Sequence, residues 1–165
     1  LYGTLQRSDS ADKVVLQAAE AIAMLGDRQI YPKLWTRLIS AYADDRVIGI
    51  RAMGALGTEE ARNALITMLD DAVPEVRLAA AEQLGKLGCP TGEPEVLAIV
   101  DKYPNTDGDP QSQDRIKILT ALAIGEIGTP PVTKHLPGLL RDPSKPVRLA
   151  AAKAVLRSAR KRASS

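Results

Sequence analysis

The sequence predicts an all-α fold of the α-solenoid type, a superhelix of about four and a half helical hairpins. Two observations lead to this prediction. The 165-residue chain is 45% hydrophobic but only 3% aromatic and has no Phe, so its core must be aliphatic and rich in Ala, the best helix former. In addition, the short pattern apolar-Gly-x-apolar-Gly recurs along the chain, and repetition of one helical unit defines a solenoid.

The repeated pattern ends at residues 26, 57, 88, 128 and 159. The steps between these positions are therefore 31, 31, 40 and 31 residues. A step of this length accommodates two short helices and two turns. The longer step carries an insertion, which we place at about residues 104–113, "PNTDGDPQSQ".

Three columns of this alignment are apolar in every unit, and they lie four, seven and ten residues before the terminal position. The members are Ile22, Met53, Leu84, Ile124 and Val155; Ala19, Ile50, Ala81, Ala121 and Ala152; and Leu16, Val47, Leu78, Ile118 and Leu149. Steps of three keep these side chains mostly on one side of a helix. The pattern predicts second helices, named B, at 13–25, 45–56, 75–87, 114–127 and 146–159. First helices, named A, are expected at 30–42, 59–69, 93–103 and 131–141.

Residues at the helix ends agree with this phase. Gly26, Gly57, Gly88 and Gly128 fall where a helix ends and a left-handed backbone is favoured. Carboxylates lie at or before the B-helix starts, where we expect them to cap free N–H groups. These are Asp45, Asp71, Asp114 and Asp142. Three further glycines inside B helices, Gly54, Gly85 and Gly125, indicate close approach of neighbouring helices.

The apolar columns also predict which substitutions matter. Ala81→Glu places a charge on the buried stripe of a central unit, so we expect it to be severely destabilising. Gln83 lies off that stripe, so Gln83→Glu is expected to be mild.

The run from Asp71 to Gly88, "DAVPEVRLAAAEQLGKLG", closely resembles the HEAT-like repeat of phycobilisome-lyase-type proteins and of many bacterial repeat proteins. The run from Asp142, "DPSKPVRLAAAKAVL", resembles it again. The resemblance covers about residues 12–159. It implies the fold and is nearly silent on function.

The resemblance also implies a structural ladder between repeats, formed by an Asp in the A–B turn and an Arg early in helix B. Asp71 with Arg77, and Asp142 with Arg148, match it. Arg46 and Lys117 occupy the Arg column in the other full units, but Ser40 and Gln111 replace the Asp. We therefore expect the ladder to be incomplete at those two junctions.

The expected organisation is an N-terminal segment at 1–11, the repeat array at 12–159 and a basic C-terminal tail at 160–165. The C-terminal end is expected to be capped, because Ser158 replaces an apolar residue and the last turn is basic. The first B helix has no full A partner, so we expect more protein to precede Leu1. Alternatively, residues 1–5 fold across the open edge, or a second copy docks there as a dimer.

No catalytic residue, cofactor or metal site is expected. His135 is the sole histidine and is followed by Leu136, whereas HEAT-repeat iron hydroxylases use repeated His-Glu pairs. Cys89 has no second cysteine and no nearby histidine, so it is interpreted as a turn residue. Residues 107–109, "DGD", are similar to half of a calcium loop but lack its spacing and closing Glu. A solvated loop is expected there.

The exposed edge of the B helices is the candidate partner-binding surface. Its residues lie six and two positions before the end of each unit. They are Glu20, Met24, Arg51, Glu82, Lys86, Leu122, Glu126, Lys153 and Arg157. The signs of their charges alternate, so neighbours are able to pair, and the long basic stripe of a nucleic-acid groove is absent.

The leading functional hypothesis is a non-catalytic protein-interaction scaffold that binds a partner through the concave B-helix face. A second is a binder of nucleic acid or of another anionic surface through the basic C-terminal end. Its residues are Arg141, Lys145, Arg148, Lys153, Arg157, Arg160, Lys161 and Arg162. A third, suggested by the resemblance alone, is a lyase-like or regulatory enzyme subunit. The single cysteine suits a reducing compartment without excluding the cell envelope, and no apolar run is long enough to span a membrane.

Overall fold

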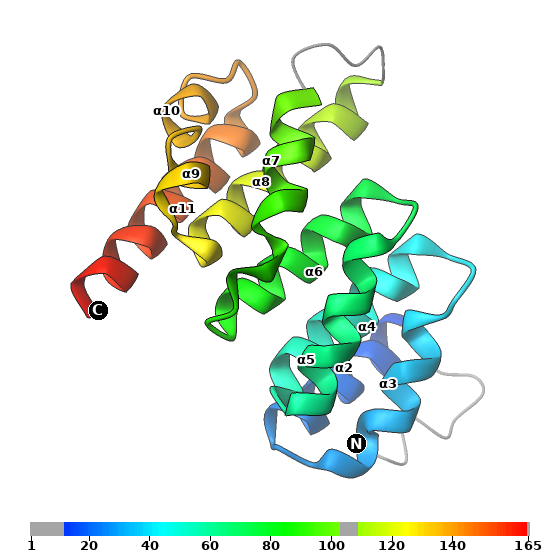
Figure 1. The fold of residues 1–165 in the computed structure, drawn as a ribbon. Helices are drawn as coiled ribbons and strands as arrows, with labels where there is room; N and C mark the ends of the chain where they lie inside the picture. The colour runs from blue at the N-terminus through cyan, green and yellow to red at the C-terminus, as the bar shows by residue number, and fades with distance from the viewer. Residues whose placement is uncertain (1–11, 103–108, 165) are drawn as a thin grey trace.

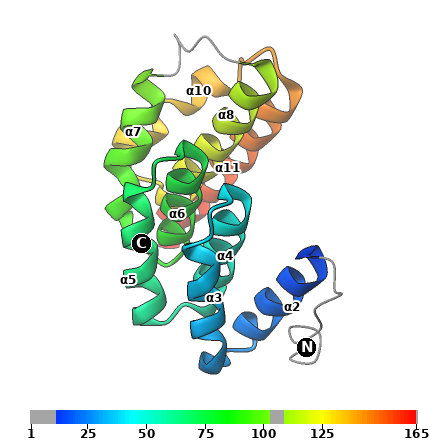
Figure 2. The ribbon, with the colours of Figure 1, turned by 90° about the vertical axis from the view of Figure 1, so that its right-hand side faces the viewer.

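The helices form two layers that run side by side along the length of the molecule (Figure 1). The computed structural model describes residues 12–102 and 109–164. In this part of the chain all regular structure is helical. In the layer of longer helices each helix packs against the next one in chain order, from α2 at one end of the molecule to α11 at the other (Figures 1 and 2). The expected α-solenoid is confirmed.

The inner layer consists of the B helices. They are α2 (Asp12–Met24), α4 (Ala43–Leu56), α6 (Pro74–Lys86), α8 (Pro110–Ile127) and α11 (Lys145–Ser164). Gly26, Gly57, Gly88 and Gly128 follow the first four of these helices and have φ between 63° and 75°. This left-handed backbone suits glycine, and the glycines end the helices where the repeat pattern predicts.

The other layer consists of shorter A segments. They are η1 (Arg28–Ile30) with α3 (Tyr31–Leu38), α5 (Glu59–Thr67) with η2 (Met68–Asp70), η3 (Pro90–Gly92) with α7 (Glu93–Lys102), and α9 (Pro130–Thr133) with α10 (Leu136–Leu139). The last segment was expected to be one helix over 131–141, which is wrong. In a continuous helix Pro137 would have no N–H for the carbonyl of Thr133, and its ring would clash with that carbonyl, so the helix is interrupted.

Two other boundaries differ from the sequence prediction. Helix α8 begins at Pro110, so residues 110–113 of the expected insertion are helical. Asp109 is the N-cap of α8, because its carboxylate accepts a hydrogen bond from the backbone N–H of Ser112. Asp107, Gly108 and the preceding part of the insertion lie outside the described residues. At the other end, α11 continues to Ser164, so residues 160–164 are the last turns of a helix instead of a tail.

The apolar columns form the core of the central units. Leu78, Ala81 and Leu84 of α6 are each 0% exposed. In α11 the same columns point outward, since Leu149 is 72% exposed, Val155 is 38% exposed and Ala152 is exposed. The C-terminal end was expected to be capped, and this is wrong. Ser158 is buried, and the apolar stripe of α11 is uncovered in the described part of the chain because no further helix packs on it.

Glycines in the B helices let neighbouring helices approach closely. A Cβ at Gly125 would lie 2.6 Å from Cα of Ala154, and one at Gly54 would lie 2.4 Å from Oε1 of Gln83. At Gly85 a Cβ would meet the backbone of Glu126 and Ile127 at 2.8–2.9 Å. In the alignment of the repeats, this last contact is shifted along α8 by nearly one helical turn relative to the other two. The shift occurs at the junction that carries the insertion.

Of the four carboxylates expected to cap B helices, Asp71 and Asp142 stabilise turns between repeats instead, and Asp45 and Asp114 lie within α4 and α8. The Asp71 carboxylate accepts a hydrogen bond from the N–H of Val73, and the Asp142 carboxylate accepts one from the N–H of Ser144. These are Asx turns that lead into α6 and α11. The same carboxylates bind cations of the preceding unit, namely Arg46 and Lys117.

The expected ladder pairs are therefore wrong. Arg77 donates to the backbone carbonyl of Asp71, and its Nε donates to the Glu95 carboxylate at 3.0 Å. Arg148 likewise donates to the carbonyl of Asp142. Each carboxylate is bound by the cation one repeat earlier, because the turn of one hairpin packs beside the start of the preceding B helix. The ion pairs between repeats form at Arg46 and Lys117, the two junctions where the ladder was expected to be incomplete.

Candidate functional site

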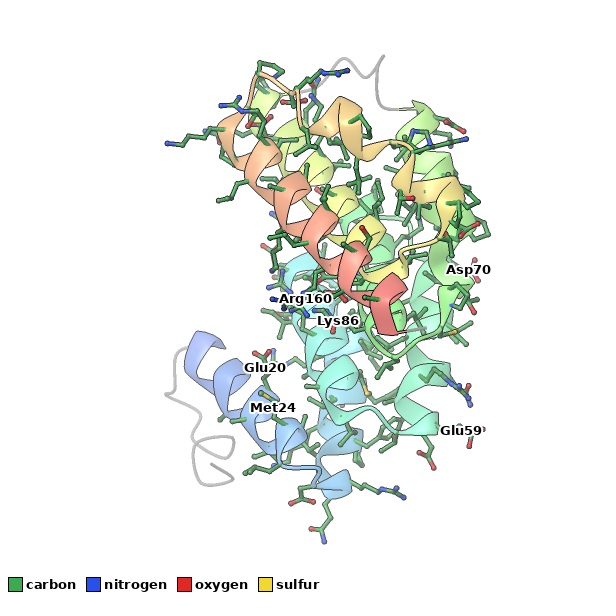
Figure 3. All side chains as sticks on the ribbon, turned by 90° about the vertical axis from the view of Figure 1, so that its left-hand side faces the viewer. Glu20, Met24, Glu59, Asp70, Lys86 and Arg160 are labelled. Atoms are coloured by element: carbon green, nitrogen blue, oxygen red, sulfur yellow. The ribbon has the colours of Figure 1, made fainter. Side chains whose placement is uncertain are left out.

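A groove opens on the B-helix layer where α2, α4 and α6 meet. It has a volume of about 410 Å³ and is lined by seven residues, Glu20, Met24, Arg51, Gly54, Ala55, Gln83 and Lys86. Four of them, Glu20, Met24, Arg51 and Lys86, belong to the candidate surface predicted from the repeat columns. Figure 3 shows Glu20 and Met24 on α2 and Lys86 further along the same face. Glu59 and Asp70 lie at the opposite edge of the molecule (Figure 3).

The groove exists because small residues form its floor. Gly54 has no side chain and Ala55 has only a methyl group, so the surface of α4 is low between α2 and α6. The Gln83 side chain packs against Gly54, where it occupies the space that a Cβ would take. Met24 rises beside this floor with 72% of its surface exposed. An unbranched thioether side chain of this kind adapts to differently shaped apolar partners.

The charges around the groove are of both signs. Glu20 lies on one side, and Arg51 and Lys86 lie on the others. Lys86 forms an ion pair with Glu82 at 2.8 Å, and the Glu82 side chain is only 9% exposed. In the described part of the chain Arg51 is exposed and forms no such pair. Arg51 is thus the cation of the groove that is best placed to bind a carboxylate of a partner.

The other predicted surface residues lie outside this groove. Glu126 is 7% exposed and pairs with Arg157 across α8 and α11, with 3.5 Å between Oε1 and Nε. Leu122 is half-buried and packs on a small cluster of alanines, and Lys153 is exposed on α11. The two ion pairs agree with the expected pairing of alternating charges. They also mean that Glu82 and Glu126 are engaged within the protein.

Gln83 was missed as a site residue, and its expected position off the buried surface is wrong. It is 4% exposed, because the position five residues before the repeat end faces the neighbouring B helix. The sequence carries a signal for this. The same column holds Ala52, Ala123 and Ala154, which are at most 1% exposed, so a Gln there is conspicuous.

The remaining candidate groups are separate from the groove. His135 borders a cavity of about 340 Å³ between α7, α8 and α10, and its Nε2 is buried without a hydrogen-bond partner among the described residues. Cys89 lies in the turn before η3, where its Sγ is 2.9 Å from the Thr91 hydroxyl. This hydrogen bond lowers the pKa of the Cys89 thiol. Among the described residues, His, Cys, Asp and Glu nowhere gather in a group of three that would hold a metal ion.

Lys161 links three B helices at their C-terminal ends. Its ammonium group donates to the backbone carbonyl of Gly85 at 2.6 Å and to the carbonyl of Glu126. A cation is favourable there because helix C-termini carry partial negative charge. No helix in the described residues has the length and hydropathy needed to cross a membrane.

The alternation of A and B helices defines a repeat protein of the α-solenoid class, and comparisons with known proteins agree. Residues 37–113 match the family model for HEAT repeats. The chain is also similar to a solved structure, the complex of CpcE and CpcF of phycocyanin lyase from Nostoc sp. PCC7120. The identity is 25%, the TM-score is 0.61, and the alignment covers 96% of this chain. It covers 63% of the other chain, so this protein spans less than two thirds of that chain.

No curated protein is significantly similar to this chain in sequence. Residues 37–113 are thus similar to HEAT repeats, and the structural likeness agrees with an α-solenoid fold over most of the chain. The expected α-solenoid fold is thereby confirmed. HEAT repeats suggest a protein-interaction scaffold.

Proposed function

We propose that this protein is a non-catalytic interaction scaffold that binds a segment of a partner protein in the groove between α2, α4 and α6. The observation that carries the proposal is the exposed Met24 beside a floor of Gly54 and Ala55, with charges of both signs at the rim. Interfaces combine an adaptable apolar centre with a polar rim in this way.

The groove chemistry defines the segment that fits it. Met24, Gly54 and Ala55 accept an apolar side chain, while the backbone floor at Gly54 allows close approach. Arg51 offers a bidentate site for a carboxylate, and Glu20 offers an acceptor for a cation. A partner segment that carries an apolar residue between two opposite charges satisfies all of these groups.

Two further observations support a protein as the partner. The part of the groove formed by α4 and α6 lies within residues 37–113, which match the HEAT-repeat model, and the similar solved structure is a complex of two proteins, CpcE and CpcF. Gln83 is the one buried polar side chain among the seven residues that line the groove, whereas sites for small substrates gather several polar groups.

Site-specific photocrosslinking tests the proposal. A photoreactive residue replaces Met24 in one variant and Glu59 in another, and each variant is expressed in cells of the source organism. We expect one discrete protein to crosslink at Met24 and not at Glu59, because Glu59 lies at the opposite edge of the molecule (Figure 3). Equal crosslinking from both positions contradicts the groove as the binding site.

The captured protein is then purified and its affinity measured. Arg51→Glu should weaken binding by about tenfold or more, because it places like charges at the contact. The matched control Glu59→Arg also changes the charge of an exposed side chain by two and should leave the affinity within about twofold. An unchanged affinity for Arg51→Glu refutes the role of this groove.

A second candidate function is favoured by the structural likeness. It is a lyase-like or regulatory subunit, since the similar structure belongs to a phycocyanin lyase. Titration of the purified chain with phycocyanin, followed by analytical ultracentrifugation, tests this candidate. Co-sedimentation that Arg51→Glu abolishes would make phycocyanin the partner of the groove, and separate sedimentation argues against this function.

A further inference from the structure

The outer face of α11 exposes a stripe of apolar residues that the other B helices bury. Leu149 is 72% exposed, Leu156 is 66% exposed and Val155 is 38% exposed. Ala152 lies between them on the same side of the helix and is exposed as well. In α6 the equivalent columns are covered by α8 and by the segment η3–α7 of the following repeat. The stripe therefore has the composition and register of a helix-packing surface.

A groove runs beside this stripe. It has a volume of about 500 Å³ and lies between α11 and the broken segment α9–α10. Its apolar lining includes Leu136, Leu140 and Val155, and Leu140 is 38% exposed. The interruption of the A segment at Pro137 leaves this space beside α11. The exposed apolar surface is thus continuous from α10 to the outer face of α11.

Arg148 makes the turn contacts of its counterparts in earlier repeats but has no ion pair with a described carboxylate. Its Nη1 donates to the carbonyls of Asp142 and Pro143 at 2.9 and 2.8 Å. Arg46 and Arg77 bind the carbonyls of their own turns in the same way. In both earlier cases the remaining edge of the guanidinium binds a carboxylate of the next repeat.

Those carboxylates are Asp71 for Arg46 and Glu95 for Arg77. No described carboxylate forms an ion pair with Arg148. The turn carbonyls hold the Arg148 guanidinium as they hold those of Arg46 and Arg77. A carboxylate on a helix that packs against α11 would therefore be able to form the ion pair that those two arginines form.

The charge of α11 indicates which kind of helix is able to pack on its outer face. Residues 145–164 contain seven Lys and Arg residues and no Asp or Glu. A second copy packed α11 against α11 would bring like charges together, which is costly across an interface. A helix with acidic residues beside its apolar stripe is complementary to this surface in both respects.

We propose that the outer face of α11, together with the α10–α11 groove, docks an acidic amphipathic helix of a partner protein. The apolar side of that helix packs on Leu149, Ala152 and Leu156. One of its carboxylates takes the position beside Arg148, and another acidic residue faces the exposed Lys153. This site is on a different helix from the α2–α4–α6 groove and is independent of the function proposed for that groove.

Fluorescence anisotropy with a designed probe tests the inference on the full chain. The probe is a synthetic amphipathic peptide of about 20 residues with one leucine stripe flanked by glutamates. The comparison peptide has the same composition, reordered so that leucines and glutamates are spread around the helix. We expect a dissociation constant on the order of 10 µM for the first peptide and at least about tenfold weaker binding for the second. Equal binding of both peptides would show that charge alone is recognised and would overturn the proposal.

Variants separate the contributions of the surface. The double substitution Leu149→Gln and Leu156→Gln changes exposed side chains, so the melting temperature should stay the same while affinity falls at least about tenfold. Arg148→Gln should weaken binding by about three- to tenfold. The control Arg62→Gln removes the same charge from an exposed position of α5, outside both surfaces, and should leave the peptide affinity unchanged.

Two further probes address anionic surfaces. A DNA duplex and vesicles of anionic phospholipid are titrated into the same protein. The proposal predicts that both bind more weakly than the peptide at physiological salt. Tighter binding of DNA that is insensitive to the leucine substitutions, or tighter binding of vesicles that the leucine substitutions abolish, would assign α11 to nucleic acid or to membrane instead.

Discussion

The guanidinium of Arg46 binds the carboxylate of Asp71 through two hydrogen bonds, although the residues are 25 positions apart. The Nε–Oδ2 distance is 2.8 Å and the Nη2–Oδ1 distance is 3.0 Å. The two side chains are only 13% and 10% exposed. The Nη1 of Arg46 donates to the carbonyls of Ser40 and Ala41, so one side chain joins the turn of its own hairpin to that of the next.

This bidentate pair predicts that Arg46→Lys is not a conservative change. Lysine supplies a point charge without the planar donors that engage both oxygens, so we expect unfolding free energy to fall by about 1–3 kcal/mol. The exposed Arg62, which is 4.0 Å from Glu59, is the control, and Arg62→Lys should cost less than about 0.5 kcal/mol. Urea denaturation followed by circular dichroism measures both, and equal midpoints would contradict the structural role of the pair.

A graded series at α6 tests the burial of its two packing faces. Ala81 is 0% exposed and packs directly on Gly92, where not even a Cβ would fit. Ala81→Glu should therefore cost about 3–5 kcal/mol or prevent folding. Gln83→Glu buries a charge against α4 and should cost about 1–3 kcal/mol. The exposed Asn63→Asp should change stability by less than about 0.5 kcal/mol. Thermal unfolding ranks the three, and a Gln83→Glu protein as stable as Asn63→Asp would place Gln83 on the surface.

Gly85 should resist replacement although alanine is the better helix former. A Cβ there would lie 2.8 Å from the carbonyl carbon of Glu126, and backbone of α8 would have to move. We expect Gly85→Ala to lower the unfolding free energy by about 1–3 kcal/mol. Gly138 has open space around it, so Gly138→Ala should be neutral or stabilising by up to about 1 kcal/mol. A stabilising effect of Gly85→Ala in the same denaturation assay would disprove the close approach of α6 and α8.

Asp142 predicts a loss of stability in acid. Burial alone raises the pKa of the Asp142 carboxyl, but the hydrogen bonds from Lys117 and Ser144 and the nearby charges outweigh burial and lower it. A folded-state pKa below the unfolded value means that the ionised form stabilises the fold. This contribution is complete above the unfolded pKa of about 3.9 and is lost as pH falls through the folded pKa.

The difference in unfolding free energy between the wild-type protein and Asp142→Asn should therefore be largest at neutral pH and shrink in acid. Asp70→Asn, at an exposed position, should show little difference at any pH. Urea titrations across this range measure both. A difference that stays constant down to the acid limit would mean that the Asp142 charge does not contribute.

The thiol of Cys89 should react at lower pH than an ordinary cysteine. The Thr91 hydroxyl hydrogen bond lowers its pKa, so the midpoint of its pH–rate profile with iodoacetamide should fall below about 8.5. Thr91→Val removes the hydroxyl and should move the midpoint upward. An identical profile for both proteins would exclude the hydrogen bond as the cause.

The phase of the repeats could be read from the residues because its determinants are local. The glycines at 26, 57, 88 and 128 adopt the left-handed backbone expected of them, and the apolar columns of α6 are fully buried. The ends of the helices and the spacing of the apolar columns each depend on one helix and its nearest turn. Part of the groove followed for the same reason, since helical spacing places Glu20 and Met24 on one edge of α2.

The contacts between repeats depend on how helices pack, and sequence spacing does not contain this information. Asp71 precedes Arg77 by a few residues, yet its carboxylate binds Arg46 because the turn of one hairpin lies beside the preceding B helix. Gln83 lies off the apolar stripe, yet it is buried because the glycine at position 54 brings α4 close to α6. The stripe of α11 matches the buried columns in sequence and is exposed, because burial requires a neighbouring helix that the described chain does not supply. Local periodicity thus determined the helices, whereas pairing, burial and the open surfaces arose only when the helices packed.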